Sequence, residues 1–132
     1  LPSMRARKRG HVALMSSLAS FRGMGTTPAY SAAKAAVRVW GEGLRNVVAA
    51  DGVAVSVICP GFVVSPMTDV NDFPMPFLMS TANAARIVKR GLDARRGRIA
   101  FPWPTYFMVW LLALMPDALA ALVTRNSPVK PG

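Results

Sequence analysis

The stretch that decides the fold is Val53-Ala54-Val55-Ser56-Val57-Ile58-Cys59, an apolar run rich in β-branched residues that ends at Pro60-Gly61. Strands of a parallel sheet have this composition, because helices cover both of their faces. Upstream, Val12-Ala13-Leu14-Met15-Ser16 is a second apolar run consistent with a buried strand. The single cysteine, Cys59, lies in the first run, where we expect a buried and inert thiol.

A long helix is predicted between these two strands, from Ala29 to about Ala50. Pro28 suits the start of a helix and Asp51-Gly52 suits its end. Gly41 and Gly43 inside it are expected to permit the close approach of a neighbouring helix. Apolar residues recur mostly at spacings of three and four, as on one face of a helix: Ala32, Ala33, Ala36, Val37, Trp40, Leu44, Val47 and Val48.

The rest of the chain continues the alternation of strands and helices. Residues 18–28 read as a loop, 65–80 as an unusually apolar loop, 81–93 as a helix capped by Ser80 or Thr81, and 98–101 as a short strand. Such alternation implies a parallel sheet with right-handed crossovers. We therefore expect an α/β fold, the C-terminal half of a Rossmann-like, doubly wound parallel sheet, with an apolar helical tail. Three strands are too few for such a sheet alone, so we expect further strands upstream.

The apolar tail is predicted as a separate segment, so that the chain divides into residues 1–102 and 103–132. Its residues 106–115 carry no charge, Pro116-Asp117 interrupts the run, and 118–123 resume it. A membrane-spanning helix needs about 20 apolar residues, so we do not expect this tail to span a membrane. An interfacial helix, a lid on a substrate pocket and a subunit contact remain open alternatives.

The chain is strongly basic, with 16 Lys and Arg against 6 Asp and Glu and a net charge of +10. Such an excess suits nucleic acid, an anionic membrane surface or a phosphorylated ligand, but also an ordinary solvated surface. We expect no nucleic-acid partner, because the basic residues are not interleaved with aromatic ones and no nucleic-acid motif accompanies them. The basic residues gather in two places: Arg5, Arg7, Lys8 and Arg9, then Lys89, Arg90, Arg95, Arg96 and Arg98.

Metal binding and secretion have no support in the sequence. A lone histidine, His11, and a lone cysteine cannot build a His-based or multi-Cys metal site, so we expect no metal. No signal peptide is visible. We expect a cytoplasmic protein, with peripheral membrane contact through residues 103–123 as an open alternative.

Candidate chemistry lies in Tyr30-Ser31-Ala32-Ala33-Lys34. A tyrosine and a lysine four residues apart share one helix face. The ammonium group favours the phenolate, so we expect the pKa of Tyr30 to fall from about 10 towards the range of a general acid or base. The alternative is an amphipathic helix whose lysine extends to solvent. Ser17 and Pro60 follow the two strands, at the carboxyl ends where parallel sheets bind ligands.

Three motifs together resemble the short-chain dehydrogenase/reductase family, from about residue 10 to residue 101. They occur in the order and at the spacing that the family shows. The motifs are Leu14-Met15-Ser16-Ser17-Leu18-Ala19-Ser20, Pro28-Ala29-Tyr30-Ser31-Ala32-Ala33-Lys34-Ala35-Ala36 and Cys59-Pro60-Gly61-Phe62-Val63-Val64-Ser65-Pro66-Met67.

The resemblance implies a catalytic role for three residues. Tyr30 would exchange a proton with the substrate oxygen, and Ser17 would hydrogen-bond the same oxygen, with Ser16 as the neighbour that could be mistaken for it. Lys34 would lower the pKa of Tyr30 and bind the nicotinamide ribose. The implied reaction is hydride transfer between NAD or NADP and an alcohol or carbonyl carbon.

The resemblance also implies the nicotinamide end of a cofactor site. Pro60 and Gly61 would line it, the backbone of Val63 would contact the carboxamide, and Ser65 stands where the family usually has threonine. The family's Gly-rich turn has no counterpart in these residues, nor does the asparagine of its proton relay. We therefore expect a fragment with weak cofactor binding and little activity. A non-catalytic remnant that binds a partner or a membrane is the alternative.

The substrate and the oligomeric state are also expectations. Large apolar residues in segment 65–80 suggest a small apolar carbonyl or alcohol substrate, although they could simply pack that segment down. The long helix 29–50 is rich in small residues, and the family often pairs through it, so we expect a homo-oligomer when the protein is full length. The apolar residues of the segment are Phe73, Met75, Phe77, Leu78 and Met79.

Overall fold

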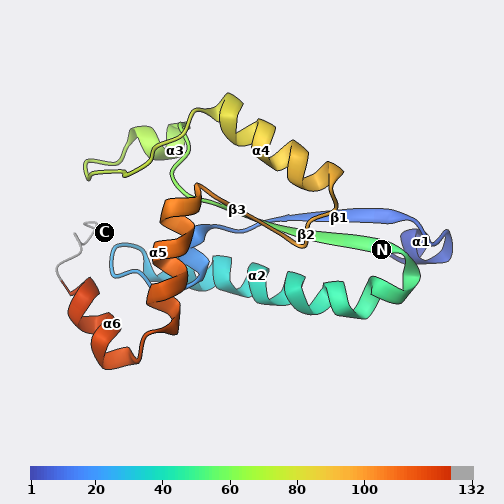
Figure 1. The fold of residues 1–132 in the computed structure, drawn as a ribbon, viewed down its shortest axis with the longest axis horizontal. Coiled ribbons are helices and arrows are strands. Elements are labelled where there is room, and N and C mark those ends of the chain that lie inside the picture. The colour runs from blue at the N-terminus through green and yellow to red at the C-terminus, as the bar shows by residue number, and fades with distance from the viewer. Residues whose placement is uncertain (126–132) are drawn as a thin grey trace.

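The computed structural model describes residues 1–125, and it has the predicted α/β architecture (Figure 1). Its three strands are β1 (Gly10–Met15), β2 (Val53–Pro60) and β3 (Arg98–Phe101), in the sheet order β1-β2-β3. Both pairs of neighbouring strands are parallel, so all three carboxyl ends meet at one edge of the sheet. The parallel sheet and the two-sided cover of helices confirm the predicted class.

Helices cover the two faces of the sheet. The long helix α2 (Pro28–Val48) packs against β2 on one face, and α4 (Thr81–Asp93) packs against β3 on the other (Figure 1). A short 3-10 turn, η2 (Ala49–Asp51), follows α2 and ends at Gly52, whose φ of 69° is left-handed. The predicted helix ends are thus right to within two residues. At the start of α4 the cap is Ser80, whose hydroxyl accepts a bond from the Asn83 N–H at 3.3 Å.

The glycines inside α2 have different surroundings from those expected. A Cβ on Gly41 would stand 2.7 Å from a methyl group of Leu14 and 2.7 Å from one of Val57, so this glycine lets the helix approach the sheet and not another helix. Around Gly43 nothing lies within 4 Å of the same position. Of the two glycines inside α2, Gly41 therefore serves the packing of the helix on the sheet, and Gly43 does not serve packing among the described residues.

The core follows β2, where side chains on both strand faces are buried, as its composition predicts. Cys59 is completely buried and free. Burial raises the pKa of its thiol, and this outweighs the opposing charge of Arg98, so the expectation of an inert thiol agrees with the structure. The buried apolar side chains of the sheet are Val53, Val55, Val57, Ile58, Cys59, Ile99 and Phe101.

Three short helical turns lie outside the helices that the sequence predicts. They are α1 (Pro2–Ala6), η1 (Leu18–Ser20) and α3 (Pro66–Asp69). Each of α1 and α3 begins with a proline, whose fixed φ suits the first turn of a helix. These turns are too short for periodicity to reveal them.

The apolar tail forms two helices, α5 (Trp103–Leu114) and α6 (Asp117–Thr124), broken near Pro116 as expected. Helix α5 packs against β3 and η1, on the same side of the sheet as α2 (Figure 1). Of the helices in residues 1–125, none is long and apolar enough to cross a membrane. The last part of the predicted tail, residues 126–132, lies outside the described residues.

Candidate active site

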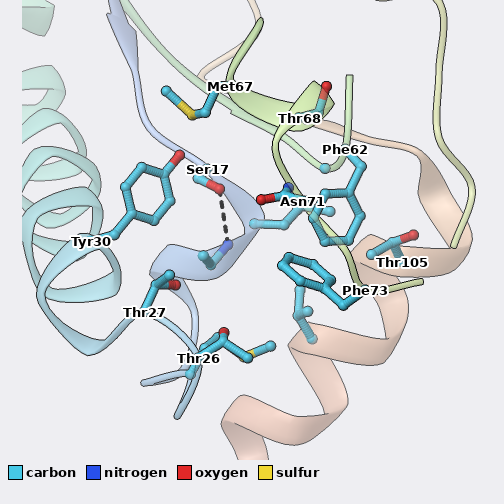
Figure 2. A pocket seen from close by; sticks show the side chains of 15 residues that line it. Ser17, Thr26, Thr27, Tyr30, Phe62, Met67, Thr68, Asn71, Phe73 and Thr105 are labelled. Carbon is cyan, nitrogen blue, oxygen red and sulfur yellow. Dashed lines mark hydrogen bonds between the residues drawn. The ribbon is translucent and has the colours of Figure 1, made fainter. Parts of the chain in front are cut away.

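A cavity of about 390 Å³ lies at the carboxyl edge of the sheet, where the three strands end (Figure 2). The turn after β1, the first turn of α2, the loop after β2, α3 and helix α5 all contribute to its wall. Among residues 1–125, no charged side chain lines it, although the chain carries a net charge of +10. The lining residues are Ser17, Leu18, Ala19, Met24, Thr26, Thr27, Tyr30, Gly61, Phe62, Met67, Thr68, Asn71, Phe73, Thr105 and Val109.

Ser17 faces this cavity from the end of β1. Its hydroxyl oxygen caps the 3-10 turn η1 by accepting a bond from the Ala19 N–H at 3.1 Å. The hydroxyl proton points to the carbonyl of Pro60 at 3.5 Å, at the far limit of a hydrogen bond. The cap fixes the position of the oxygen, while the weak second contact leaves its proton available to a ligand.

The neighbouring Ser16 has a structural place. It is buried, and its hydroxyl donates to the Lys34 carbonyl at 2.8 Å, which joins the end of β1 to α2. Ser16 is not among the residues that line the cavity. Of the two adjacent serines, Ser17 therefore has access to a ligand.

Tyr30 enters the cavity from the first turn of α2. Figure 2 shows its ring pointing into the cavity, with the hydroxyl on the side of Ser17. The Nζ atom of Lys34 lies 5.6 Å from the centre of this ring and donates a hydrogen bond to the Met15 carbonyl at 3.2 Å. The structure thus brings together the three side chains that the sequence selected for catalysis.

The four residues predicted at the nicotinamide end lie at the last residue of β2 and in the segment that follows it. Gly61 lines the cavity, where a Cβ would stand 3.1 Å from Pro102, so the wall is close-packed at that point. The carbonyl of Pro60 faces Ser17, as described above. Val63 pairs with Met79 in an isolated bridge, and Ser65 caps α3. These last three are not among the residues that line the cavity.

Several cavity residues were missed in the sequence. Thr26 and Thr27 come from the loop before α2, Thr68 and Asn71 from α3 and the turn after it, and Thr105 from α5. No single spacing connects them, because they come from three separate segments of the chain. The only available signal was their position shortly before or after a predicted element, on the side of the sheet that binds ligands.

A charged cluster lies behind the cavity wall. Glu42 of α2 accepts hydrogen bonds from Arg38 and from Arg98 of β3, and Arg98 also donates to the Tyr106 hydroxyl at 3.1 Å. Both guanidinium groups lie over the ring of Phe21, at 4.6 Å for Arg38 and 5.2 Å for Arg98. The cluster fixes α2, β3, α5 and the turn after Ser17 relative to one another.

The pKa of Glu42 depends on two opposing effects in this cluster, burial and the neighbouring arginines. Burial alone would raise it, but the hydrogen bond and the charge of Arg98, followed by those of Arg38, hold the pKa of this carboxyl below its ordinary value. Glu42 is therefore ionised at neutral pH and balances the two arginines. Its ionisation keeps the rear of the cavity wall in one arrangement.

Comparison with known proteins supports the resemblance. The family described as short chain dehydrogenase matches residues 1–73, which is more than half of the chain. An uncharacterized oxidoreductase of Myxococcus xanthus is 42% identical over 126 residues, which cover 96% of this chain and 50% of that protein.

Solved structures have the same fold. A short-chain dehydrogenase from Streptomyces avermitilis has a TM-score of 0.70 at 26% identity, over 95% of this chain and 53% of that one. A short chain dehydrogenase from Burkholderia cenocepacia in complex with NADP has a TM-score of 0.75 at 20% identity, over 96% of this chain and 51% of that one.

The chain therefore belongs to the short-chain dehydrogenase/reductase family, whose members are oxidoreductases that use NAD or NADP. It spans about half the length of the curated relatives it matches.

Proposed function

We propose that the protein is an NAD- or NADP-dependent oxidoreductase that interconverts an alcohol and a carbonyl on a small apolar substrate. The observation that carries this proposal is that Ser17 and Tyr30 line one cavity, while Lys34, which is not part of that lining, lies beside the Tyr30 ring. The three side chains come from two elements that the sheet brings together at the edge where such folds bind ligands.

In the reducing direction, Tyr30 donates its phenolic proton to the carbonyl oxygen of the substrate. Ser17 donates a hydrogen bond to the same oxygen, so that the charge that develops there is stabilised by two donors. Lys34 lies beside the same ring, with its Nζ atom 5.6 Å from the ring centre. In the oxidising direction, the Tyr30 phenolate takes the proton back from the alcohol.

The residues present suit the nicotinamide end of a dinucleotide. One bond from Lys34 goes to the Met15 carbonyl, and an ammonium group has three N–H donors, so donors remain for ribose hydroxyls. Gly61 keeps the cavity wall free of a side chain at the end of β2. When bound, the nicotinamide would supply or accept the hydride. We assign Pro60, Gly61, Val63 and Ser65 to its surroundings.

The proposed substrate is uncharged around the reacting carbon. The cavity wall combines aromatic and aliphatic side chains with hydroxyl and amide groups, and none of the described residues that line it is charged. Burying a charged substrate group without a partner in such a wall would be unfavourable. A ketone or secondary alcohol with apolar substituents suits this wall, because it is uncharged and its oxygen can bind the hydroxyl groups there.

The first test is the substitution Tyr30→Phe, made in the protein expressed from its complete reading frame. We expect the reduction of apolar ketones to fall by about 10²–10⁴-fold, because proton transfer by a positioned side chain contributes about that much. Cofactor affinity, measured by fluorescence titration with NADH and NADPH, should stay within about threefold, a free-energy change below about 1 kcal/mol.

The matched control is Thr124→Val, which removes a hydroxyl that bonds to the Ala120 carbonyl within its own helix α6, outside the cavity lining. It should retain most activity. The proposal is wrong if Tyr30→Phe retains most activity as well. A wild-type protein that binds neither cofactor would favour the alternative, a non-catalytic binding module.

A further inference from the structure

The outward side of α5 is an exposed apolar surface. It consists of five residues at helical spacing on one face, which we call the α5 outer face. Trp103 is 75% exposed, and the rings of Phe107 and Trp110 stack against each other with centroids 6.4 Å apart. Contiguous exposed apolar surface of this kind marks an interaction site. The five residues are Trp103, Phe107, Trp110, Leu111 and Leu114.

The charges around this face do not oppose an anionic surface. Between Trp103 and Arg125 the only acidic residue is Asp117. Its carboxylate pairs with Arg22 at 2.7 Å, and the same arginine donates to the Met115 carbonyl at 3.2 Å. The chain as a whole carries a net charge of +10, and α6 adds further exposed apolar side chains at Leu119, Leu122 and Val123.

We propose that the α5 outer face docks the protein onto the surface of a bilayer that contains anionic lipid. Tryptophan and phenylalanine side chains on a helix that lies in the plane of the interface insert among headgroups, and a basic protein is attracted to anionic lipid. The helix has 12 residues, which fits lying on the bilayer and not crossing it.

This docking would bring the cavity to the lipid surface. The inner side of α5 carries Thr105 and Val109 of the cavity wall, while its outer face carries the exposed tryptophans. The bond from Arg98 to Tyr106 holds the helix on β3, so the two sides keep a fixed relation. The inference rests on the surface alone and does not depend on the proposed reaction.

The test measures binding of the full chain to vesicles of phosphatidylcholine with about one third phosphatidylglycerol, and to vesicles of phosphatidylcholine alone. Co-sedimentation gives the bound fraction, and brominated lipids report tryptophan insertion by quenching. The variant Trp103→Ser with Phe107→Ser removes two side chains of the α5 outer face. Because burial of each contributes roughly a factor of ten, we expect binding to anionic vesicles to fall at least tenfold.

The control is Trp40→Ser, which removes a tryptophan of similar exposure, 59%, from α2. It should bind anionic vesicles as the wild type does. This variant also leaves Trp103 and Trp110 as the only tryptophans in the chain, so its fluorescence reports α5 alone. We expect brominated lipid to quench it, a result that needs no substitution in α5.

Three outcomes would overturn the proposal. One is the absence of vesicle binding and of quenching in the Trp40→Ser variant. Another is equal binding by the double variant and the wild type while circular dichroism shows both folded. The third is a lower molecular mass of the double variant in analytical ultracentrifugation, with its vesicle binding unchanged. A second copy of the chain would then be what covers this face in the wild type.

Discussion

Replacing Glu42 by glutamine tests whether the charged cluster behind the cavity stabilises the fold. The substitution keeps the size of the side chain and removes its charge. Glu42 is partly buried, with 28% of its side chain exposed, and it lies between the guanidinium groups of Arg38 and Arg98. Without the carboxylate, two like charges would share the ring of Phe21 with no anion between them.

The expected loss of stability follows from the burial of these groups. Exposed ion pairs contribute about 0–1 kcal/mol. Breaking a fully buried pair costs about 3–5 kcal/mol, because one charge is left without a partner. The cluster lies between these limits and involves two arginines, so we expect Glu42→Gln to lower the free energy of unfolding by about 1–3 kcal/mol at pH 7.

The effect should depend on pH in one direction. The pKa of Glu42 is lower in the folded chain than its ordinary value of 4.5, so the unfolded chain takes up a proton more readily. The stabilisation is therefore complete above about pH 4.5 and is lost as the pH falls through the lower, folded pKa. The difference between wild type and Glu42→Gln should shrink over that range.

The assay is urea unfolding, followed by circular dichroism at pH 7 and at pH 4 and below. Asp93→Asn is the matched control, because Asp93 pairs with Lys89 at 2.6 Å on the exposed side of α4. We expect that change to cost less than about 0.5 kcal/mol. Equal effects of the two substitutions at pH 7, or a Glu42→Gln effect that does not change with pH, would refute this account of the cluster.

Two further predictions concern helix α2. Gly41→Ala should lower the free energy of unfolding, measured in urea, by about 1–2 kcal/mol, because its Cβ would clash with Leu14 and Val57. Gly43→Ala should raise the same free energy by up to about 1 kcal/mol. A rise in stability with both substitutions would contradict this packing. We also predict that the full-length protein forms a dimer or tetramer through α2, where the small residues Ala32 and Ala36 allow a second helix to approach closely, and a monomer in analytical ultracentrifugation would contradict that.

The sequence predicts the sheet and the long helix well because their patterns are continuous. In β2, almost every side chain is buried, so the run has to be apolar on both faces. The packing of Gly41 was predicted less well. A glycine in a helix signals close approach, but the sequence does not say whether a strand or a helix approaches.

The candidate site could be predicted where its residues lie at fixed spacing. Tyr30 and Lys34 share a helix face, and Ser17 and Gly61 follow strands, so local rules place all four near one edge. Whether each performs its proposed role stays a prediction. Thr105 could not be found in this way, because it reaches the cavity only through the packing of α5 on β3.

The charged cluster could likewise be predicted only where its residues lie close together in the sequence. The pair Arg38 and Glu42 is readable from its spacing of four on α2. Arg98, however, lies 56 residues from Glu42 and belonged to a basic group for which an ordinary solvated surface was one of the interpretations. Its position was hidden because pairing between distant elements depends on the register of β2 with β3.

Helix α5 connects the proposed chemistry with the proposed membrane contact. The sequence left three roles open for this segment: an interfacial helix, a pocket lid and a subunit contact. The structure shows that α5 forms part of the cavity wall, since Thr105 and Val109 line it. A wall of this kind does not exclude an interfacial role, because the α5 outer face lies on the opposite side of the same helix. An apolar substrate dissolved in a bilayer would then meet the cavity where the protein touches the lipid, and the uncharged lining that the described residues form suits such a substrate.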